Sequence, residues 1–323
     1  MDSPIVRPKS KALFPSTATT LEATMAVADN TKPVFKQFDV VSDHSDHKYS
    51  KDITSFTNKT VSKKIMAEWR ILEKDLPENI YVRTYETRLD LVRAVIIGAE
   101  GTPYEDGLFF FDIKFPGNYP NEPPMVFYHS HGLQVNANLY ESGKVCLSLL
   151  NTTYGRGNEQ WDSSQSTLLQ VLVSIQAFVL NEQPFFNTPF TGFLKRWFGM
   201  KGTSEVYNGN VFIATRKSMF YLLQNPPKNF EAFTAEHFRG RASRILRACK
   251  AFAKRGRYKD TVACRSPFWL LMFSNKKLKK WMKQLYPHLV KAFEKNEASL
   301  MHVEPGQGLS EEDSGQENVH EES

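Results

Sequence analysis

Cysteine is scarce in this chain, with 3 residues among 323. Cys146, Cys249 and Cys264 are an odd set, and they lack the Cys-x-x-Cys spacing of a zinc site. A secreted disulfide scaffold is therefore excluded, and a reducing compartment is expected.

Long apolar runs are also missing. The longest strongly apolar run, Phe268 to Phe273, is far too short to cross a bilayer, and residues 1–30 contain no apolar segment of signal-peptide length. The sequence also lacks a Gly-rich loop that could hold nucleotide phosphates. We expect a soluble protein of the cytoplasm, the nucleus or both, with no membrane contact, no cofactor and no metal ion.

The formal net charge of the chain is small, at +6, and the charged residues are unevenly distributed along the sequence. Nine Lys or Arg residues and no carboxylate lie between Arg239 and Lys259, whereas seven carboxylates and no Lys or Arg follow from Glu304 onward. We interpret the basic run as a solvated helix face or as a dock for an acidic partner or the chain's own acidic tail. Nucleic acid binding is the less favoured alternative, because no binding motif accompanies the basic residues.

The pattern of apolar residues divides the chain into four regions. Residues 1–60 show no sustained period and are expected to be mostly disordered, and residues 61–225 form a core with a following helix. Residues 226–300 are expected to form a helical extension, and residues 301–323 an acidic disordered tail.

Helices and strands within these regions follow from periodicity and turn residues. Ile65, Trp69 and Leu72 lie on one face of a helix predicted over Val61 to Asp75. Glycine and proline turns then separate four segments that we expect to pair as an antiparallel meander. These strands are predicted at Ile80–Tyr85, Leu91–Ile97, Leu108–Phe115 and Met125–Tyr128, and further helices at Ser166–Ile175, Glu205–Leu223, Phe268–Phe273 and Leu278–Phe293.

Four motifs stand at fixed spacings after the third predicted strand. A proline-rich turn, Tyr119–Pro124, is followed by Asn136-Ala137-Asn138. Cys146 comes eight residues after Asn138, and Trp161 opens the next segment, which we expect to be helical. In this order the motifs resemble the core of the ubiquitin-conjugating enzymes, which carry Tyr-Pro-x-x-Pro-Pro, His-Pro-Asn, the active cysteine and a tryptophan.

The resemblance covers roughly Val61 to Phe190 and implies a fold. That fold is of the α+β class, with a four-stranded antiparallel sheet flanked by helices, and here a helical C-terminal extension would follow it. The pre-core segment Phe38–His47 is similar to a plant branch of the family. The residues Asn151–Gln160 look like the insertion of a subgroup of large conjugating enzymes, some of which act as conjugating enzyme and ligase in one chain.

One motif departs from the family pattern, since Asn136-Ala137-Asn138 replaces His-Pro-Asn. The family histidine supports the local turn, so Asn136 would have to take over that role. We expect a rearranged loop that retains activity. The insertion contains Gly155-Arg156-Gly157, and it either shields the thioester, contacts the incoming substrate or is a passive surface loop.

The resemblance assigns two catalytic residues. Cys146 would accept ubiquitin as a thioester, since even an unshifted thiol pKa of about 8.5 leaves a few per cent thiolate at neutral pH. Asn138 would stabilise the tetrahedral intermediate or hold the loop over Cys146. A Cys-His hydrolase built from Cys146 with His129 or His131 is less favoured, because no oriented third partner is apparent.

The remaining polar candidates are weaker. Glu182 and Asp162 are candidates for assisting the attacking lysine, although the role stays unassigned. Lys63, Lys64 and Arg70 on the first helix either contact the activating enzyme or form a solvated face. A metal site at His44 and His47, beside Asp43 and Asp46, is not expected, and Cys249 and Cys264 are interpreted as structural.

The sequence therefore predicts a ubiquitin-conjugating transferase that uses Cys146. Its partners would be ubiquitin, the activating enzyme, a substrate protein and, where one is needed, a ubiquitin ligase. Two alternatives stay open: a hybrid conjugating enzyme and ligase that selects its own substrate, and a non-catalytic ubiquitin-binding adaptor. The presence of Cys146 argues against the adaptor, because such variants typically lack the cysteine.

Overall fold

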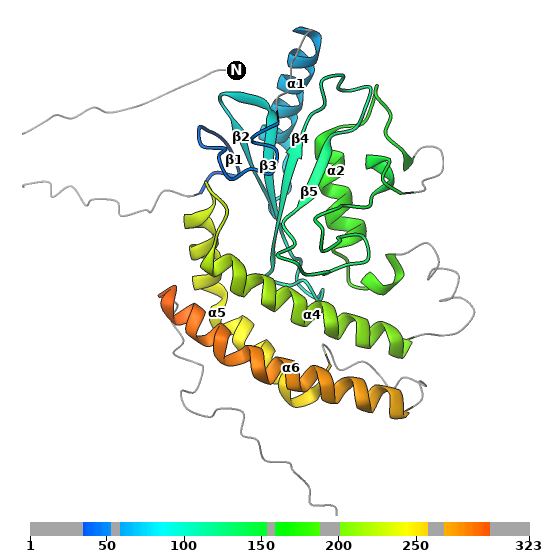
Figure 1. Cartoon of the computed structure of the whole chain (residues 1–323), viewed down its shortest axis with the longest axis vertical. Helices are drawn as coiled ribbons and strands as arrows, with labels where there is room; N and C mark the ends of the chain where they lie inside the picture. Colours follow the sequence, from blue (N-terminus) through cyan, green and yellow to red (C-terminus); the bar gives the residue numbers. More distant parts are fainter. Residues whose placement is uncertain (1–34, 53–58, 154–158, 188–200, 258–267, 298–323) are drawn as a thin grey trace, which may run out of the picture. The chain divides into compact units, whose positions relative to one another are not determined.

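The computed structural model describes residues 35–52, 59–153, 159–187, 201–257 and 268–297. Within these ranges a sheet with helices packed against it is followed by three long helices (Figure 1). The strands are β1 (Phe38–Val41), β2 (Ile80–Tyr85), β3 (Arg88–Ile97), β4 (Leu108–Lys114) and β5 (Met125–Tyr128), and the helices are α1 (Lys59–Asp75), α2 (Leu168–Ser174), α4 (Lys201–Gln224), α5 (Glu231–Arg255) and α6 (Phe268–Lys295).

The sheet has the order β1-β2-β3-β4-β5, and β2 to β5 form the antiparallel meander that the sequence predicts. The predicted α+β class is confirmed, but the strand count of four is wrong by one. Strand β1 pairs in parallel with β2, Phe38 opposite Val82, and it lies in the segment predicted to be mostly disordered. A four-residue strand has no period of its own to detect, and contacts from elsewhere fix it: the Gln37 Nε2 atom donates to the Ile80 carbonyl at 2.9 Å.

Helix α1 packs its apolar face against the sheet, and a buried carboxylate lies in the same face. Glu68 is only 1% exposed. Its Oε1 atom accepts a 2.8 Å hydrogen bond from the Tyr119 hydroxyl, and its Oε2 atom accepts one of 2.9 Å from the backbone N–H of Leu168. Glu68 thereby connects α1 to the proline turn and to the first residue of α2.

Helix α2 begins within two residues of the helix predicted at Ser166–Ile175, but Trp161, seven residues before it, does not open this helix. Thr167 caps it with a reciprocal bond to Gln170, a capping box that fixes its start. The chain continues as a π-helical turn, Ile175–Val179. The Trp161 Nε1 atom instead donates to the carbonyl of Pro120 at 2.7 Å, which holds the proline turn in place.

The helix that follows the core, α4, packs with α5 and α6 of the predicted extension, and the three, called the helical extension from here on, contact the core (Figure 1). The ring of Phe230 meets Phe110 of β4 edge to face at 5.3 Å, and the Arg216 Nη1 atom of α4 donates to the Pro103 carbonyl at 3.1 Å. The two helical segments predicted near the C-terminal end form one helix, α6, which contains Pro287. None of the helices in the described ranges has the length and apolarity needed to cross a membrane.

The pre-core segment packs on the sheet through a buried ionic network. Arg93, fully buried on β3, bonds Asp112 of β4 through its Nε atom at 2.7 Å and Asp46 through its Nη1 atom at 2.8 Å. Asp46 also accepts a 2.9 Å hydrogen bond from the backbone N–H of Lys228, between α4 and α5. Although burial favours the neutral form, His129 and Arg93 together hold the pKa of Asp112 well below its usual value. The expectation of disorder therefore fails here, because these long-range charges order the segment.

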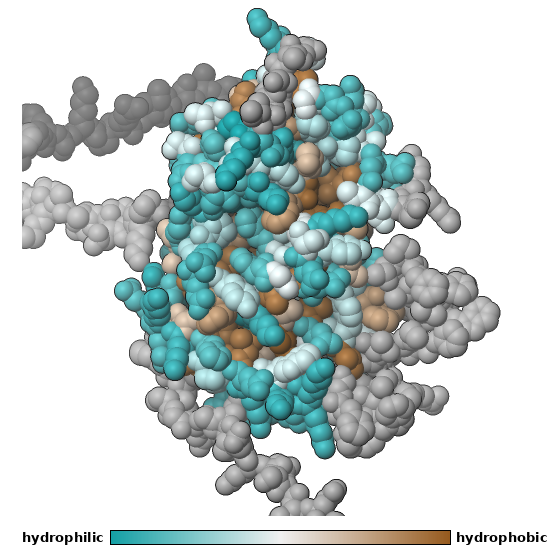
Figure 2. All heavy atoms as spheres, in the orientation of Figure 1, coloured by the Kyte–Doolittle hydropathy of each residue, from teal (hydrophilic) through white to brown (hydrophobic). Residues whose placement is uncertain are grey.

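Hydrophilic side chains predominate on the face of the molecule shown in Figure 2, and apolar side chains gather in small patches between them. His47 of the pre-core segment is buried. Its Nε2 atom lies 3.1 Å from the Val92 carbonyl, and its Nδ1 atom accepts from the backbone N–H of Tyr49 at 3.2 Å. A neutral ring with the proton on Nε2 satisfies both contacts.

Candidate active site

Cys146 lies at the edge of a cleft of about 970 Å³ and is half-buried. The volume is at the upper end of the range of small-molecule pockets, so the cleft has room for a lysine side chain and the chain that carries it. Its walls come from the segment around Cys146, from Asp162 and from the π-helical turn after α2, where Phe178 is 68% exposed. The thiol therefore has the access that a nucleophile needs.

Asn138 and Cys146 are joined by two hydrogen bonds. The backbone N–H of Cys146 donates to the Asn138 carbonyl at 2.8 Å, and the Asn138 Nδ2 atom donates to the Cys146 carbonyl at 3.0 Å. The turn between them is closed by pairing of Leu139 with Val145. The structure thus brings together the two residues that the sequence predicts as a pair. A primary amide carries two N–H groups, so Asn138 can hold the loop with one and offer the other to a ligand.

Asn136 supports the turn from below and is completely buried. Its Oδ1 atom accepts a 2.8 Å hydrogen bond from the backbone N–H of Asn138. Its Nδ2 atom donates to the Tyr104 hydroxyl at 2.7 Å and to the Val179 carbonyl at 2.9 Å. The Oδ1 atom and both N–H groups of the Asn136 side chain are therefore hydrogen-bonded. Through these bonds Asn136 supports the turn, as the sequence analysis predicts.

Thr152 braces the other side of Cys146, and sequence reasoning missed it. Its hydroxyl accepts from the backbone N–H of Leu147 at 2.9 Å and lies 2.8 Å from the Val145 carbonyl. No spacing in the sequence marks this threonine, because its partners are backbone groups. The glycine-flanked part of the insertion, Gly155-Arg156-Gly157, lies outside the described residues.

Comparison with known proteins decides the family. A family model described as ubiquitin-conjugating enzyme matches residues 64–195. A protein of Arabidopsis thaliana named as ubiquitin-conjugating enzyme E2 38 is 54% identical over 221 residues, covering 68% of this chain and 68% of its own length. The chain belongs to the ubiquitin-conjugating enzyme family. The predicted family and its plant-like character are confirmed, and with them the class of enzyme, a ubiquitin transferase.

Other relatives are longer than this ubiquitin-conjugating enzyme. Ubiquitin-conjugating enzyme E2 25 of Arabidopsis thaliana is 55% identical over 222 residues, which are 68% of this chain but only 36% of that protein. A human protein named as a dual E2 ubiquitin-conjugating enzyme and E3 ubiquitin-protein ligase, BIRC6, is 35% identical over 245 residues, 69% of this chain and 5% of its own length. The match therefore spans about a third of the length of the Arabidopsis protein and a small part of the human protein.

Tyr140 is a second residue near the thiol that the sequence analysis did not predict. The charge of an ionised Cys146 side chain nearby raises the pKa of Tyr140. The phenol is 40% exposed. A phenol that stays protonated can donate to a thiolate, so Tyr140 is placed to stabilise the ionised sulfur.

The other described cysteine and the two histidines form no competing site. Cys249 is fully buried, and burial raises the pKa of its thiol to about 11. The His129 Nε2 atom lies 3.0 Å from Asp112 in the buried network, while His131 stacks on Tyr221 at 5.8 Å. Neither histidine is among the described residues that line the cleft, so the structure brings no Cys-His pair together. Cys264 lies outside the described residues.

Of the two acidic candidates, only Asp162 lines the cleft. The Asp162 Oδ1 atom accepts hydrogen bonds from the Ser164 hydroxyl at 2.6 Å and from its backbone N–H at 2.8 Å, and these bonds lower the pKa of Asp162. An aspartate with a lowered pKa is a poor base but keeps its charge, so it attracts an ammonium group rather than removing its proton. Glu182 is exposed and is not among the described lining residues.

Proposed function

We propose that this ubiquitin-conjugating enzyme carries ubiquitin as a thioester on the Sγ atom of Cys146. Cys146 gives its thiol proton to water, and its thiolate attacks the carbonyl carbon of the thioester held by the activating enzyme. The new C–S bond forms, the C–S bond to the activating enzyme breaks, and that enzyme's sulfur leaves as a thiolate that takes up a proton from water. A thioester is exchanged for a thioester, so little free energy is lost. The observation that carries the proposal is the half-exposed Cys146 joined to Asn138 by two hydrogen bonds at the edge of an open cleft.

In the second step we propose that a substrate lysine attacks the Cys146 thioester. Its neutral amine forms the C–N bond, the C–S bond breaks, Cys146 leaves as a thiolate that Tyr140 is placed to stabilise, and the amine's excess proton goes to water. Asn138 stabilises the transient oxyanion through its second amide N–H. The loss of one such donor typically costs about 10² to 10³ in rate.

The lysine must first lose the proton it carries at neutral pH, since its ordinary pKa is about 10.4. Asp162 attracts the ammonium into the cleft. The exposed ring of Phe178 then covers the stem and reduces the hydration of the amine, which favours its neutral form.

Several partners follow from the family assignment. Family membership implies contact with ubiquitin, the activating enzyme and a ligase, and we propose α1 as the surface for the activating enzyme. Lys63 and Arg70 are exposed on this helix, and Lys64 is half-buried. A thiol that must stay free for charging suits the reducing cytoplasm or nucleus.

A second candidate function is a hybrid that selects its substrate without a separate ligase. The similarity to the dual conjugating enzyme and ligase extends over 245 residues, whereas the family model matches residues 64–195. The shared sequence therefore extends beyond the residues that the family model matches. We propose that the extension supplies substrate contacts, which distinguishes the hybrid from the simple conjugating enzyme.

The test is a chase of the preformed ubiquitin thioester with free lysine, with arginine as the matched amine control. Lysine that accelerates loss of the thioester, while arginine does not, supports transfer to an amine. Loss at the same rate in both shows hydrolysis only and contradicts the proposal. Repeating the chase with a substrate protein, with and without ligases, separates the hybrid from the ligase-dependent enzyme.

A further inference from the structure

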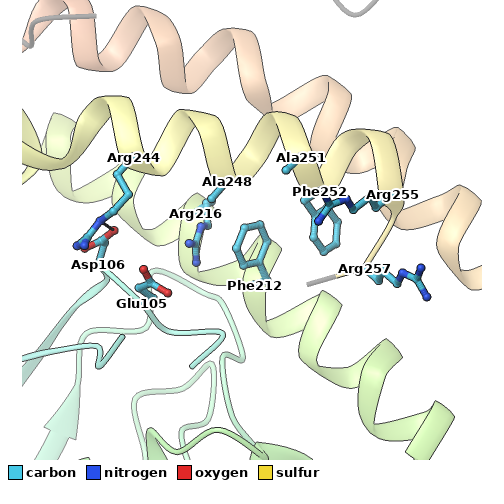
Figure 3. A pocket seen from close by; sticks show the side chains of 10 residues that line it. All are labelled: Glu105, Asp106, Phe212, Arg216, Arg244, Ala248, Ala251, Phe252, Arg255 and Arg257. Carbon is cyan, nitrogen blue, oxygen red and sulfur yellow. Dashed lines mark hydrogen bonds and ion pairs between the residues drawn. The ribbon is translucent and has the colours of Figure 1, made fainter. Parts of the chain in front are cut away.

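A second cavity, of about 200 Å³, lies between the extension and the core loop 99–107 (Figure 3). Arg216 comes from α4, Arg244 and Arg255 from α5, and Arg257 from the residues just after α5. Glu105 and Asp106 approach from the loop. Among the lining residues that the structure describes, four arginines stand against two carboxylates, an excess of two positive charges. We call this cavity the arginine pocket.

The floor of the arginine pocket is apolar and aromatic. The rings of Phe212 and Phe252 stack with centroids 4.8 Å apart and an interplanar angle of 14°. The guanidinium of Arg216, which is 2% exposed, lies 3.6 Å from the centroid of the Phe212 ring. A cation held in an apolar wall acts through a low local dielectric, so its field on an anion in the pocket is stronger than in water.

Asp106 forms ion pairs at one end of the arginine pocket, and two arginines are exposed to solvent at the other end. Asp106, 3% exposed, bonds the Nε atom of Arg244 at 3.0 Å and lies 3.4 Å from the Nε atom of Arg241. Arg255 and Arg257 are exposed at the opposite end. The planar guanidinium matches a carboxylate with two parallel bonds. The volume is below that of a drug-sized pocket and suits one or two acidic side chains.

We propose that the arginine pocket binds carboxylate side chains, and that the chain's own acidic segment 304–322 is its occupant. This segment has seven carboxylates and no Lys or Arg, which matches the pocket's excess charge. The carboxylates are closest together at Glu311-Glu312-Asp313.

The segment starts close enough to reach the arginine pocket. The Asn296 Nδ2 atom donates to the Ala235 carbonyl of α5 at 2.8 Å, which fixes where α6 ends. From Ala235 to Arg255 the helix rises about 30 Å. The residues between Asn296 and Glu311 span up to about 50 Å when extended, so the acidic cluster reaches the pocket. A tethered segment acts at an effective concentration of about millimolar, which lets modest affinity suffice.

The test uses a fluorescent peptide with the sequence of residues 304–323 and the full chain in two forms. One form is the native chain, and in the other all seven carboxylates of the segment are replaced by amides. We expect the amide form to bind the peptide about tenfold more tightly, because the native segment competes for the pocket. Equal binding by both forms overturns the proposal.

Location of the site is tested in the amide form with two charge reversals. Arg255→Glu with Arg257→Glu should weaken peptide binding at least tenfold, whereas Arg247→Glu, exposed on the same helix but outside the pocket lining, should change it less than twofold. Equal weakening by both changes indicates a diffuse basic surface and overturns the proposal. So does binding of a single-stranded oligonucleotide in place of the peptide.

Discussion

The side-chain amide of Asn136 donates a 2.7 Å hydrogen bond to the hydroxyl of Tyr104, 32 positions earlier in the chain. Tyr104 lies in the loop that the extension holds, since the neighbouring Pro103 carbonyl accepts from Arg216 and the Asp106 carbonyl lies 3.0 Å from the His237 Nε2 atom. The extension is thereby connected to the turn that carries Asn138 and Cys146 through a short series of hydrogen bonds.

Replacement of Tyr104 by phenylalanine should slow transfer to lysine while leaving the fold intact. The change removes the acceptor of one buried Asn136 N–H group, which lowers the free energy of unfolding by about 1–3 kcal/mol. We expect a discharge rate at least threefold lower, because Asn136 no longer holds the backbone of Asn138 in one position. The rate is measured in the lysine chase.

Tyr128→Phe is the matched control for this prediction. Tyr128 is also fully buried, but its hydroxyl has no hydrogen-bond partner in the part of the chain that the structure describes. The control should leave the discharge rate and the free energy of unfolding unchanged within about 0.5 kcal/mol or raise the latter. If Tyr104→Phe and Tyr128→Phe behave alike, the hydrogen bond to Asn136 does not position the active turn.

Asn138→Ala should separate the two steps of the reaction. The thioester on Cys146 should still form, because its exchange needs an accessible thiol more than an extra donor. Discharge to lysine should fall by about 10² to 10³, since the oxyanion loses a hydrogen bond. Single-turnover measurements of charging and discharge test this, and an unchanged discharge rate would remove Asn138 from the catalytic step.

Glu68→Ala should reduce the free energy of unfolding by about 2–4 kcal/mol. The substitution leaves the Tyr119 hydroxyl and the Leu168 N–H without their buried acceptors. Urea denaturation measures the loss, and Glu73→Ala, an exposed position on the same helix, should change stability by less than about 0.5 kcal/mol. Similar effects of the two substitutions would show that the buried carboxylate is not a stabilising connection.

The stability of the chain should fall as the pH drops below about 6.5, in part because of His237. Burial, reinforced by the neighbouring Arg241, lowers the pKa of His237 from 6.5 to about 4 in the folded state. The unfolded chain binds the proton first, so acid favours unfolding between these two values, by about 2 kcal/mol at pH 5 relative to pH 7.5. Glutamine in His237→Gln keeps a donor for the Asp106 carbonyl but does not titrate. Between pH 7.5 and 5 the free energy of unfolding of this variant should therefore fall by about 2 kcal/mol less than that of the native chain. An identical loss in both proteins would contradict the assignment.

Much of the core can be predicted from the local sequence, and the parts of the fold that were not predicted have a common cause. Periodicity and turn residues give β2 to β5 and α1 to within a few residues, and the spacing of Asn138 and Cys146 predicts that the two lie together. Strand β1 and the pre-core segment were missed because they are ordered by long-range partners.

The same limit applies within the active site. Tyr140 and Thr152 act through a thiol and through backbone groups that no sequence pattern displays. The burial of Glu68 likewise depends on partners 51 and 100 positions away. In each case the decisive contact depends on the folded turn and not on the neighbouring residues in the sequence.

The most direct test of the account is the mass of the intact protein after incubation with activating enzyme, ubiquitin and ATP, before and after thiol reductant. The native chain and Cys249→Ala should gain one ubiquitin that reductant removes, Cys146→Ala should gain none, and Cys146→Ser should gain one that reductant leaves, because an oxygen ester replaces the thioester. A reductant-sensitive adduct on Cys146→Ala, or no adduct on the native chain, would contradict the central claim that Cys146 carries ubiquitin.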